Sequence, residues 1–418
     1  MSFIKAQFDL IVVGGGASGL MAAGRAAECG KRVLILEKNR KVGEKLRITG
    51  GGRCNITNAE FDAHVLLPAY GKAEQFLYSL FAQFGVKETF TFFESRGLPI
   101  VVQARKRAFP KTEKAPDVLR VLERYVHEGK VTVRTASPVT RVHGTKAGIT
   151  GVSSGKETFR ATDYLFATGS VSHPEMGSTG DGLKWLRDLG HIIKKSTPTI
   201  VPLSTKEVWS KKLAGVSLSF MKITFFVEGK KAFSGTGKIL FTHFGLSGPL
   251  ILNSAEKVAD LLHGGLVTAM IDAYPHTDLG ALERNIITTF DKNKNKTLKN
   301  IIKELVPDGT GKGILLLLGE GLDITKKVHS ITKEERKVIV RTLKALPLTV
   351  TGLMGFDRAV VAEGGVLLEE VDMRTMRSKK VPNLYITGDL LHINRPSGGY
   401  SLQLCWSTGY VAGDHAGG

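Results

Sequence analysis

Residues 8–37 read FDLIVVGGGASGLMAAGRAAECGKRVLILE, and this stretch decides the fold. The apolar run at residues 8–13 has no polar alternation and is rich in valine and isoleucine, which predicts a buried parallel strand. A glycine-rich turn follows it, then a helical stretch over residues 20–29 that Gly30 ends, and a second strand over residues 32–36. The stretch therefore predicts a complete βαβ unit near the start of the chain.

The turn between the first strand and the helix has the spacing of a GxGxxG dinucleotide-binding fingerprint, with glycines at 14, 16 and 19. Gly14 permits the tight turn, and Gly16 lets backbone N–H groups approach a pyrophosphate. Gly19 lets the helix pack close to the sheet. Because the motif follows a strand and opens a helix, it predicts a dinucleotide site and not only a structural glycine turn.

Two further parts of the unit support this site. Ala17 and Ser18 lie in the first turn of the predicted helix, whose partial positive charge favours a phosphate. Glu37 ends the second strand, 18 positions after Gly19, where its carboxylate is expected to accept hydrogen bonds from the adenosine ribose. Lys38 follows it and is a further expected cofactor contact.

Composition sets the class of protein. The chain has 418 residues, of which 42% are hydrophobic and 23% charged, as expected for two or three globular domains. Three cysteines are too few for a disulfide framework and indicate a reducing, cytoplasmic setting. The first residues lack a cleavable signal pattern, and apolar runs such as residues 314–318 are far shorter than a membrane span, so we expect no membrane association. The sequence carries no signal for oligomeric state.

The sequence pattern of the rest of the chain changes twice. A buried strand at residues 164–167 leads to Thr168 and Gly169, short alternating segments begin near residue 196, and helical, lysine-rich patterns fill residues 278–344. The last residues again show the strand-and-helix pattern of the first residues, with a strand at residues 384–387 and a final helix from about Ser401. We therefore expect an α/β fold with a split Rossmann-like nucleotide-binding domain (residues 1–195 and 366–418), an inserted β-barrel (196–277 and 345–365) and a small helical subdomain (278–344).

The tail also separates FAD from NAD as the expected cofactor. Flavin enzymes of the glutathione-reductase type carry a late strand that ends in Gly-Asp beside the ribityl chain, and Gly388 and Asp389 follow such a strand here. Asp389 is expected to bond a ribityl hydroxyl or to cap a helix. The turn at Gly399 and Ser401 starts the last helix, whose N-terminus is expected to face the flavin pyrimidine edge.

Residues 45–58, KLRITGGGRCNITN, resemble the signature of a bacterial FAD-dependent oxidoreductase family described as NAD(P)/FAD-dependent or aminoacetone-oxidase-like. Further blocks that resemble this family follow in order, at Phe109-Pro110 with Lys114-Ala115, Ala167–Gly169, Gly177–Gly182, Phe241–Pro249 and Gly398–Gln403. The resemblance covers most of the chain and implies the split FAD domain, barrel and helical subdomain named above. Members of this family are associated with reducing a uridine of large-subunit ribosomal RNA to dihydrouridine.

The chain departs from the family pattern in two places. Such proteins commonly carry a Gly-Glu pair and then an acidic residue, where this chain has Gly388-Asp389 and His392. Their usual asparagine in the closing block is Ser401 here. These departures leave FAD binding intact as an expectation and put the substrate pocket in question.

The glycine loop is expected to contact the cofactor. Its successive glycines up to Gly52 can present backbone N–H groups to an anion. Lys45 and Arg53 can add charge-assisted bonds to FAD phosphates, and Asn55 has an amide for the flavin edge. Thr168 and Gly169 complete the expected cofactor contacts.

Three residues are candidate proton donors. Cys54 is expected to deliver the second proton when a hydride attacks a polarised C=C bond, with Arg53 lowering the pKa of its thiol. A small buried packing residue is the alternative reading of Cys54. His243 and His392 are the other candidates, against the commoner structural role of histidine. No HExxH, CxxC or GxSxG occurs, so the sequence predicts no metal site and no hydrolase nucleophile.

The net charge of +19 favours an anionic partner or a merely soluble basic surface. Basic residues gather in three stretches: Arg105, Lys106, Arg107, Lys111 and Lys114; Lys292, Lys294, Lys296, Lys299 and Lys303; and Lys326, Lys327, Lys333, Arg336, Lys337, Arg341 and Lys344. The last two lie in the expected insertion, where they suit RNA phosphates or form a solvated helix face.

The leading hypothesis is a FAD-dependent reductase that transfers a hydride to an activated C=C bond, with a uridine of large-subunit ribosomal RNA as the preferred substrate. No second complete dinucleotide fingerprint is present, so NAD(P)H is expected to act as a transient reductant or to be replaced by another reductant. The alternatives are an oxidase of a small amine such as aminoacetone, a reductase of a small-molecule enone, and a non-catalytic RNA-binding flavoprotein.

Overall fold

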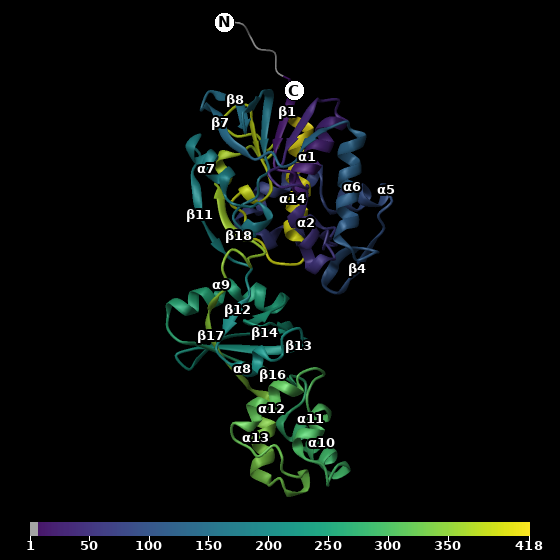
Figure 1. Ribbon diagram of the computed structural model, residues 1–418, viewed down its shortest axis with the longest axis vertical. Helices are drawn as coiled ribbons and strands as arrows, with labels where there is room; N and C mark the ends of the chain where they lie inside the picture. Colours follow the sequence, from purple (N-terminus) through teal and green to yellow (C-terminus); the bar gives the residue numbers. More distant parts are fainter. Residues whose placement is uncertain (1–6) are drawn as a thin grey trace. The chain divides into compact units, whose positions relative to one another are not determined.

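The computed structural model describes residues 7–418, which form two compact units (Figure 1). The first unit contains the residues up to Pro198 together with Phe356–Gly418, and the second contains Thr199–Gly355. Segments from both ends of the chain therefore share one unit, and the middle of the chain builds the other.

A five-stranded parallel sheet forms the centre of the first unit, with the strand order β19-β10-β1-β2-β6. Four of its strands are almost wholly buried and apolar, as a parallel sheet covered on both faces requires. The strand bounds are β1 Phe8–Val13, β2 Val33–Leu36, β6 Thr132–Arg134, β10 Ala161–Phe166 and β19 Leu384–Ile386.

Smaller sheets and helices surround this sheet. The strands pair as β3-β5-β4, β7-β8-β9 and β11-β18. Their bounds are β3 Thr57–Asn58, β4 Ile100–Gln103, β5 Arg107–Pro110, β7 Val139–Thr145, β8 Gly148–Ser154, β9 Glu157–Phe159, β11 Ile193–Pro198 and β18 Ala362–Val366. The helices are α1 Ala17–Glu28, α2 Glu44–Ile48, α3 Ala63–Leu66, α4 Glu74–Gln83, α5 Val86–Ser95, α6 Ala115–Glu128, α7 Asp181–Asp188 and α14 Tyr400–His415.

The first and last helices of this unit pack directly on each other. A side chain at Gly409 would lie 2.4 Å from the carbonyl oxygen of Ser18, and one at Gly413 would lie 2.3 Å from that of Ala22. Because neither glycine carries a Cβ, the backbones of α14 and α1 approach more closely than larger residues allow. This contact joins the fingerprint turn to the C-terminal segment.

The second unit is built on a closed six-stranded barrel in the order β12-β15-β14-β13-β16-β17, with antiparallel pairing throughout. The bounds are β12 Leu203–Thr205, β13 Ser217–Val227, β14 Lys230–Phe241, β15 Gly245–Ser247, β16 Val267–Asp272 and β17 Leu346–Leu353. The helices are α8 Val208–Lys211, α9 Pro249–His263, α10 Leu279–Lys292, α11 Leu298–Leu305, α12 Gly311–Gly319 and α13 Lys333–Lys344. Apolar residues of α10–α13 and of the barrel form one continuous core, so the helices and the barrel are a single compact unit.

The predicted fold class is confirmed: a Rossmann-type α/β unit is assembled from both ends of the chain, and a barrel with a helical segment is inserted into it. The expected return of the barrel to residue 365 is wrong. The second unit ends at Gly355, because β18 pairs antiparallel with β11 in the first unit. The first boundary lies at Pro198, at the end of β11.

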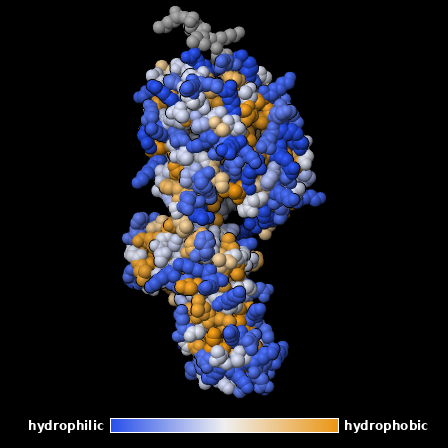
Figure 2. Space-filling model, viewed as in Figure 1, coloured by the Kyte–Doolittle hydropathy of each residue, from blue (hydrophilic) through white to orange (hydrophobic). Residues whose placement is uncertain are grey.

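Hydrophilic residues cover most of the visible face of the first unit, with apolar residues scattered between them (Figure 2). Within residues 7–418, no helix is both long and apolar enough to span a bilayer. The largest buried side chains of the first unit, such as Trp406, lie in its core between the sheet and the helices.

The glycine contact between α1 and α14 gives a first prediction. Gly409→Ala places a methyl group against the Ser18 carbonyl, so the helices must separate, and we expect a loss of about 2 kcal/mol of unfolding free energy. Denaturant unfolding followed by circular dichroism measures it. The matched control is Gly321→Ala, since nothing lies within 4 Å of the added methyl there. Equal stability of the two variants would contradict the tight helix contact.

Candidate active site

The fingerprint turn connects β1 to α1. Gly14 has a φ of +105°, and a side chain there would lie 2.6 Å from the carbonyl oxygen of Ala167. A Cβ at Gly19 would lie 2.0 Å from the Gly14 carbonyl oxygen, so the helix packs against the turn. Nothing lies within 4 Å of a Cβ built at Gly16. Packing thus explains Gly14 and Gly19, whereas Gly16 faces open space that a phosphate group fits.

The N-terminus of α1 borders that space. The helix starts at Ala17 with no side-chain cap and no acidic residue in its first turn. First-turn N–H groups have no acceptor within a helix, which makes such a terminus an anion site. The Ser18 hydroxyl accepts a hydrogen bond from the Thr387 hydroxyl at 3.2 Å. The backbone N–H groups of Ala17 and Ser18 are therefore available to hold a pyrophosphate, and the Ser18 hydroxyl keeps its own proton to donate.

Glu37 is buried at the end of β2. Its carboxylate accepts hydrogen bonds from the backbone N–H of Gly15 at 2.7 Å and of Asn39 at 2.8 Å. Burial raises the pKa of Glu37, although these two hydrogen bonds oppose the shift. The carboxylate keeps free lone pairs for a ribose hydroxyl. Lys38 is different, because its ammonium pairs with Asp181 at 2.8 Å, and its cofactor contact stays a prediction.

The glycine loop needs its glycines. Gly50, Gly51 and Gly52 have φ values of +59°, +68° and +84°, all in the left-handed region that favours glycine. The loop leads into Arg53, whose guanidinium pairs with Glu113 and stands over the Phe109 ring, with Cζ 4.3 Å from the ring centroid. The charge of Arg53 is therefore directed towards the β4–β5 hairpin.

The Cys54 thiol follows in the same loop and is fully buried, with 0% of its surface exposed. Burial raises the pKa of Cys54 to about 12. The expectation that Arg53 lowers the pKa of this thiol is wrong, because the guanidinium is engaged by Glu113 and burial penalises a thiolate. A protonated thiol still suits a proton donor, so the catalytic role of Cys54 stays a prediction.

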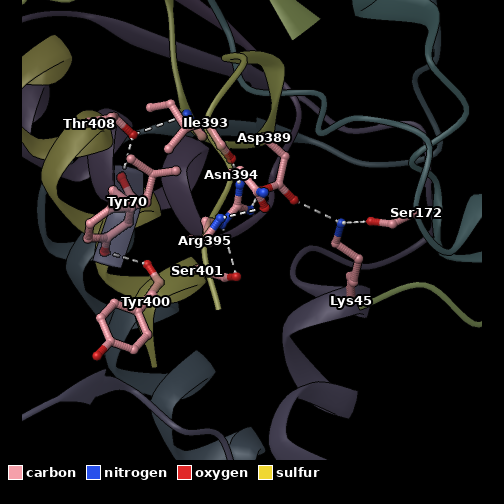
Figure 3. A network of polar contacts seen from close by, with 12 residues as sticks. Lys45, Tyr70, Ser172, Asp389, Ile393, Asn394, Arg395, Tyr400, Ser401 and Thr408 are labelled. Carbon is pink, nitrogen blue, oxygen red and sulfur yellow. Dashed lines mark hydrogen bonds and ion pairs between the residues drawn. The ribbon is translucent and has the colours of Figure 1, made fainter. Parts of the chain in front are cut away.

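A charged network connects the glycine-loop segment to the C-terminal segment (Figure 3). The Lys45 ammonium lies 3.1 Å from the Ser172 hydroxyl and 3.3 Å from the Asp389 carboxylate. Arg395 pairs with the other oxygen of Asp389, and its Nε donates to the Ser401 hydroxyl at 3.1 Å. Three of the predicted cofactor residues, Lys45, Asp389 and Ser401, therefore lie in one network.

Arg395, which connects two of these predicted residues, Asp389 and Ser401, was not identified from the sequence. Its side chain is 1% exposed, and Nη1 also donates to the Ile393 carbonyl at 2.8 Å. Burial alone raises the pKa of Asp389, but the positive charges of Arg395 and Lys45 outweigh burial, so its pKa is lowered. The signal in the sequence was a lone arginine between the Gly-Asp turn and the GGY turn, six positions after Asp389.

The two late glycine turns are rigid. Gly388 has a φ of +63°, and its N–H donates to the Thr408 hydroxyl at 3.0 Å. Gly399 has a φ of +104°, and a side chain there would lie 2.2 Å from the carbonyl carbon of Thr57. The α14 N-terminus after Gly399 has no side-chain cap and no acidic residue in its first turn. It is the second uncapped helix N-terminus at this site.

Thr168 and Gly169 end the segment after β10. Gly169 has a φ of +71°, and a Cβ there would lie 3.9 Å from the Lys45 ammonium, so this turn borders the charged network. The Thr168 hydroxyl lies 2.1 Å from a Cβ built at Gly182, which explains the glycine at the start of α7. Their cofactor contacts stay predictions.

The two candidate histidines belong to different units. His392 is half-buried in the first unit, and its Nδ1 is buried with no hydrogen-bond partner in residues 7–418. Burial and the charge of Lys194 lower the pKa of His392, so it is neutral at pH 7. His243 is exposed in the second unit, with its ring 4.8 Å from that of Phe244. Among the described residues, no cluster of His, Cys, Asp and Glu is arranged to hold a metal ion.

Buried polar atoms without partners test whether FAD fits. Asn55 Oδ1, Ser170 Oγ and His392 Nδ1 are buried in the first unit without a hydrogen bond in residues 7–418. Such atoms are costly unless a ligand or water satisfies them. Together with the open space at Gly16 and the two uncapped helix N-termini, they fit a large polar, anionic cofactor such as FAD.

Comparison with known proteins places this site in a family. The HI0933-like protein Rossmann domain family matches residues 8–415. The chain is 30% identical over 409 residues to a 3-dehydro-bile acid delta(4,6)-reductase of Clostridium scindens, with 96% of this chain and 97% of the relative covered. It is 27% identical over 408 residues to a ribosomal RNA dihydrouridine synthase of Escherichia coli, with 97% of each chain covered.

Solved structures share the fold at low identity. A 3-ketosteroid-delta4-(5alpha)-dehydrogenase from Rhodococcus jostii matches with a TM-score of 0.56 and 14% identity, covering 100% of this chain and 98% of that one. A 3-ketosteroid delta1-dehydrogenase from Sterolibacterium denitrificans matches with a TM-score of 0.52 and 14% identity, covering 98% of this chain and 99% of that one. These likenesses support the architecture of both units.

The Asp389–Arg395 pair gives a second prediction. Arg395→Met leaves a carboxylate of Asp389 buried beside Lys45 alone, and we expect a loss of about 3 kcal/mol of unfolding free energy at pH 7. In the wild type the pKa of Asp389 is lowered, so this stabilisation is present above the unfolded-state pKa of about 3.9 and is lost as the pH falls through the folded-state pKa. In the variant burial raises that pKa, so the deficit should shrink at low pH.

Thermal unfolding at pH 7 and pH 4 measures this difference. Arg374→Met is the control, since Arg374 is an exposed arginine of the same unit. The double variant Asp389→Asn, Arg395→Met should lose less than the sum of the single variants. A deficit independent of pH, or strictly additive losses, would show that the pair is not coupled.

Proposed function

Since this chain belongs to the HI0933-like Rossmann family and is a flavoprotein oxidoreductase, we propose that it reduces a carbon–carbon double bond conjugated to a carbonyl group. A uridine of large-subunit ribosomal RNA is the preferred substrate. One observation carries the proposal: over almost the whole chain, it matches relatives named for a bile acid delta(4,6)-reductase and for dihydrouridine synthases. Both names describe the saturation of such a double bond.

Different residues of the first unit would hold different parts of the cofactor. FAD, when bound, would supply the hydride, with NAD(P)H as the proposed electron source. The turn from Gly14 to Gly19 and Glu37 would hold the adenosine and pyrophosphate end. Asp389, oriented by Arg395, would bond the ribityl chain, and the N-terminus of α14 would stabilise negative charge on the flavin.

The charge distribution favours RNA as the substrate. In the second unit, exposed lysines that form no ion pair within residues 7–418 gather between α10 and α13: Lys292, Lys296, Lys299, Lys303 and Lys327. Backbone hydrogen bonds between residues 296–299 and 324–328 bring the two lysine-rich runs together. Such unneutralised charge suits a polyanion, because binding releases condensed counterions.

A steroid-like enone is the second candidate substrate. It is favoured by the 30% identity to the bile acid reductase, against 27% to the dihydrouridine synthases. Both candidates present the same conjugated bond to the flavin site. They differ in the rest of the substrate molecule. Assays with each substrate can therefore distinguish them, whereas a measurement of bound FAD cannot.

Mass mapping of ribosomal RNA gives the third prediction. In cells that lack this chain, one uridine of large-subunit RNA should be lighter by two hydrogens, because dihydrouridine is no longer formed. Wild-type chain should restore the mass. Gly16→Val should not, since its side chain extends into the space assigned to the pyrophosphate from a Cβ that has no protein atom within 4 Å.

Gly321→Val is the matched control for that variant, because a Cβ at Gly321 also has no protein atom within 4 Å, and it should restore the mass. Unchanged RNA masses together with reduction of a steroid enone by the purified protein would favour the second candidate. Purified protein that releases no FAD on denaturation would contradict both.

The proton donor gives the fourth prediction. Cys54 has a pKa of about 12 and stays protonated at neutral pH, whereas His392 has a lowered pKa and is neutral. We propose Cys54 as the donor, so Cys54→Ala should lower the rate of enone reduction by about 100-fold with bound FAD retained. Cys405→Ala is the control, as a second cysteine whose pKa burial raises to about 12.

The pH profile separates the two candidate donors. With Cys54 as the donor, the wild-type rate should be flat from about pH 6 to pH 9, since the thiol holds its proton throughout. A rate that falls as the pH rises through a value below 6.5 would instead assign the proton to His392, whose pKa is lowered from that value.

A further inference from the structure

The tip of the β4–β5 hairpin holds two exposed basic residues in a strained conformation. Arg105 has a φ of +62° and Lys106 a φ of +55°, in the region that non-glycine residues rarely adopt. Both residues are exposed, so burial of an apolar side chain does not explain the conformation. Backbone strain of this kind is concentrated at functional sites, where it fixes the direction of a side chain.

Two further arginines, Arg53 and Arg107, accompany Arg105 at this hairpin. Arg53 and Arg107 both face the ring of Phe109, with Cζ at 4.3 Å and 5.8 Å from its centroid. Burial, and then the positive charges of Arg53 and Arg105, hold the pKa of Arg107 below its ordinary value. The Arg107 guanidinium therefore lies close enough to Arg53 and to Arg105 to be repelled by each of them.

The acidic residues nearby neutralise only part of this charge. Glu113 pairs with Arg53, and Glu60 pairs with Lys106. Neither Arg105 nor Arg107 forms an ion pair with any residue between 7 and 418. Like charges left together without a counter-charge cost stability, and a bound anion removes that cost.

The arginines adjoin the candidate active site. The amide nitrogen of Asn58 lies 3.4 Å from the Arg105 carbonyl oxygen and 3.4 Å from that of Gly398, in the turn that starts α14. On the other side, a Cβ at Gly50 would lie 3.7 Å from the Phe109 ring. The hairpin thus contacts both of the segments that are expected to hold the flavin.

We propose that Arg105 and Arg107 bind a phosphodiester group of the RNA strand next to the target uridine. The inference rests on the proposed function and adds to it the contact that selects a nucleic acid. Guanidinium groups suit a phosphate because their planar N–H donors match its oxygens in pairs. The ion pair with Glu113 holds Arg53 on the Phe109 ring, so Arg53 is already neutralised and does not compete for the phosphate.

Binding of a uridine-containing single-stranded RNA oligonucleotide to the full-length, FAD-loaded protein tests this inference. The variant combines Arg105→Asn with Arg107→Gln, and asparagine is chosen because it tolerates the left-handed conformation. The affinity at 0.1 M salt should fall about 10-fold, and the slope of log affinity against log salt should fall by about 0.7, because one phosphate is no longer neutralised. Arg374→Gln, an exposed arginine of the same unit, should change neither.

Two further measurements keep the inference separate from the proposed function. FAD content should be unchanged in the double variant, and loss of FAD would overturn the inference by assigning the arginines to the cofactor phosphates. Reduction of a small neutral enone should also be unchanged. RNA affinity equal to that of Arg374→Gln, with enone reduction intact, would overturn the RNA contact and leave the proposed function standing.

A conservative variant distinguishes a specific loss of RNA binding from misfolding. Arg105→Lys keeps the charge but not the paired donors, so its RNA affinity should lie between that of the wild type and that of the double variant. Wild-type protein that reduces neither RNA nor any enone would contradict the proposed function itself, an outcome distinct from the loss of RNA binding.

Discussion

The close approach of the α1 and α14 backbones determines where the site forms. Gly409 and Gly413 present no side chain, so the carbonyls of Ser18 and Ala22 lie against the last helix. That contact brings the fingerprint turn to the end of β19, where Thr387 donates to Ser18. Both ends of the chain therefore contribute to one candidate cofactor site, although nearly 370 residues separate Thr387 from Ser18 in sequence. A dinucleotide fingerprint alone does not require this closure.

The second requirement is a balance of buried charge. Asp389 is paired on two sides, by Arg395 and by Lys45, and the sum of the three charges is positive. A buried carboxylate without these partners would be neutralised, and its pKa would rise. The surplus positive charge, together with the two uncapped helix N-termini, makes this part of the first unit suited to an anionic cofactor.

Local sequence patterns were enough to predict the strands and the glycine turns, because β1, β2 and β19 are apolar runs and the glycines carry positive φ values. They were not enough for contacts between distant segments. Arg395 and Lys45 meet on Asp389 across more than 340 residues, and no periodicity reports such a meeting. The direction of a side chain could not be predicted from sequence either. Because Arg53 and Cys54 are neighbours in sequence, Arg53 is expected to act on the Cys54 thiol, but its guanidinium is turned towards Glu113. The boundary at Gly355 was missed for a similar reason, since β18 pairs with a strand far away in sequence.

Substrate choice in such a protein has to be made away from the reacting bond. A uracil ring and a steroid enone present the same conjugated system to a flavin, so groups that contact the rest of the substrate must distinguish them. A neutral steroid gains nothing from guanidinium groups that have no counter-charge, and a bile acid offers them a single carboxylate, whereas an RNA strand offers a phosphate at every nucleotide. Arg105 and Arg107 are such groups at the edge of the site, and exposed lysines such as Lys296 and Lys327 add positive charge in the second unit. An RNA phosphate offsets the charge at the hairpin, which is the physical reason to favour RNA over a small enone.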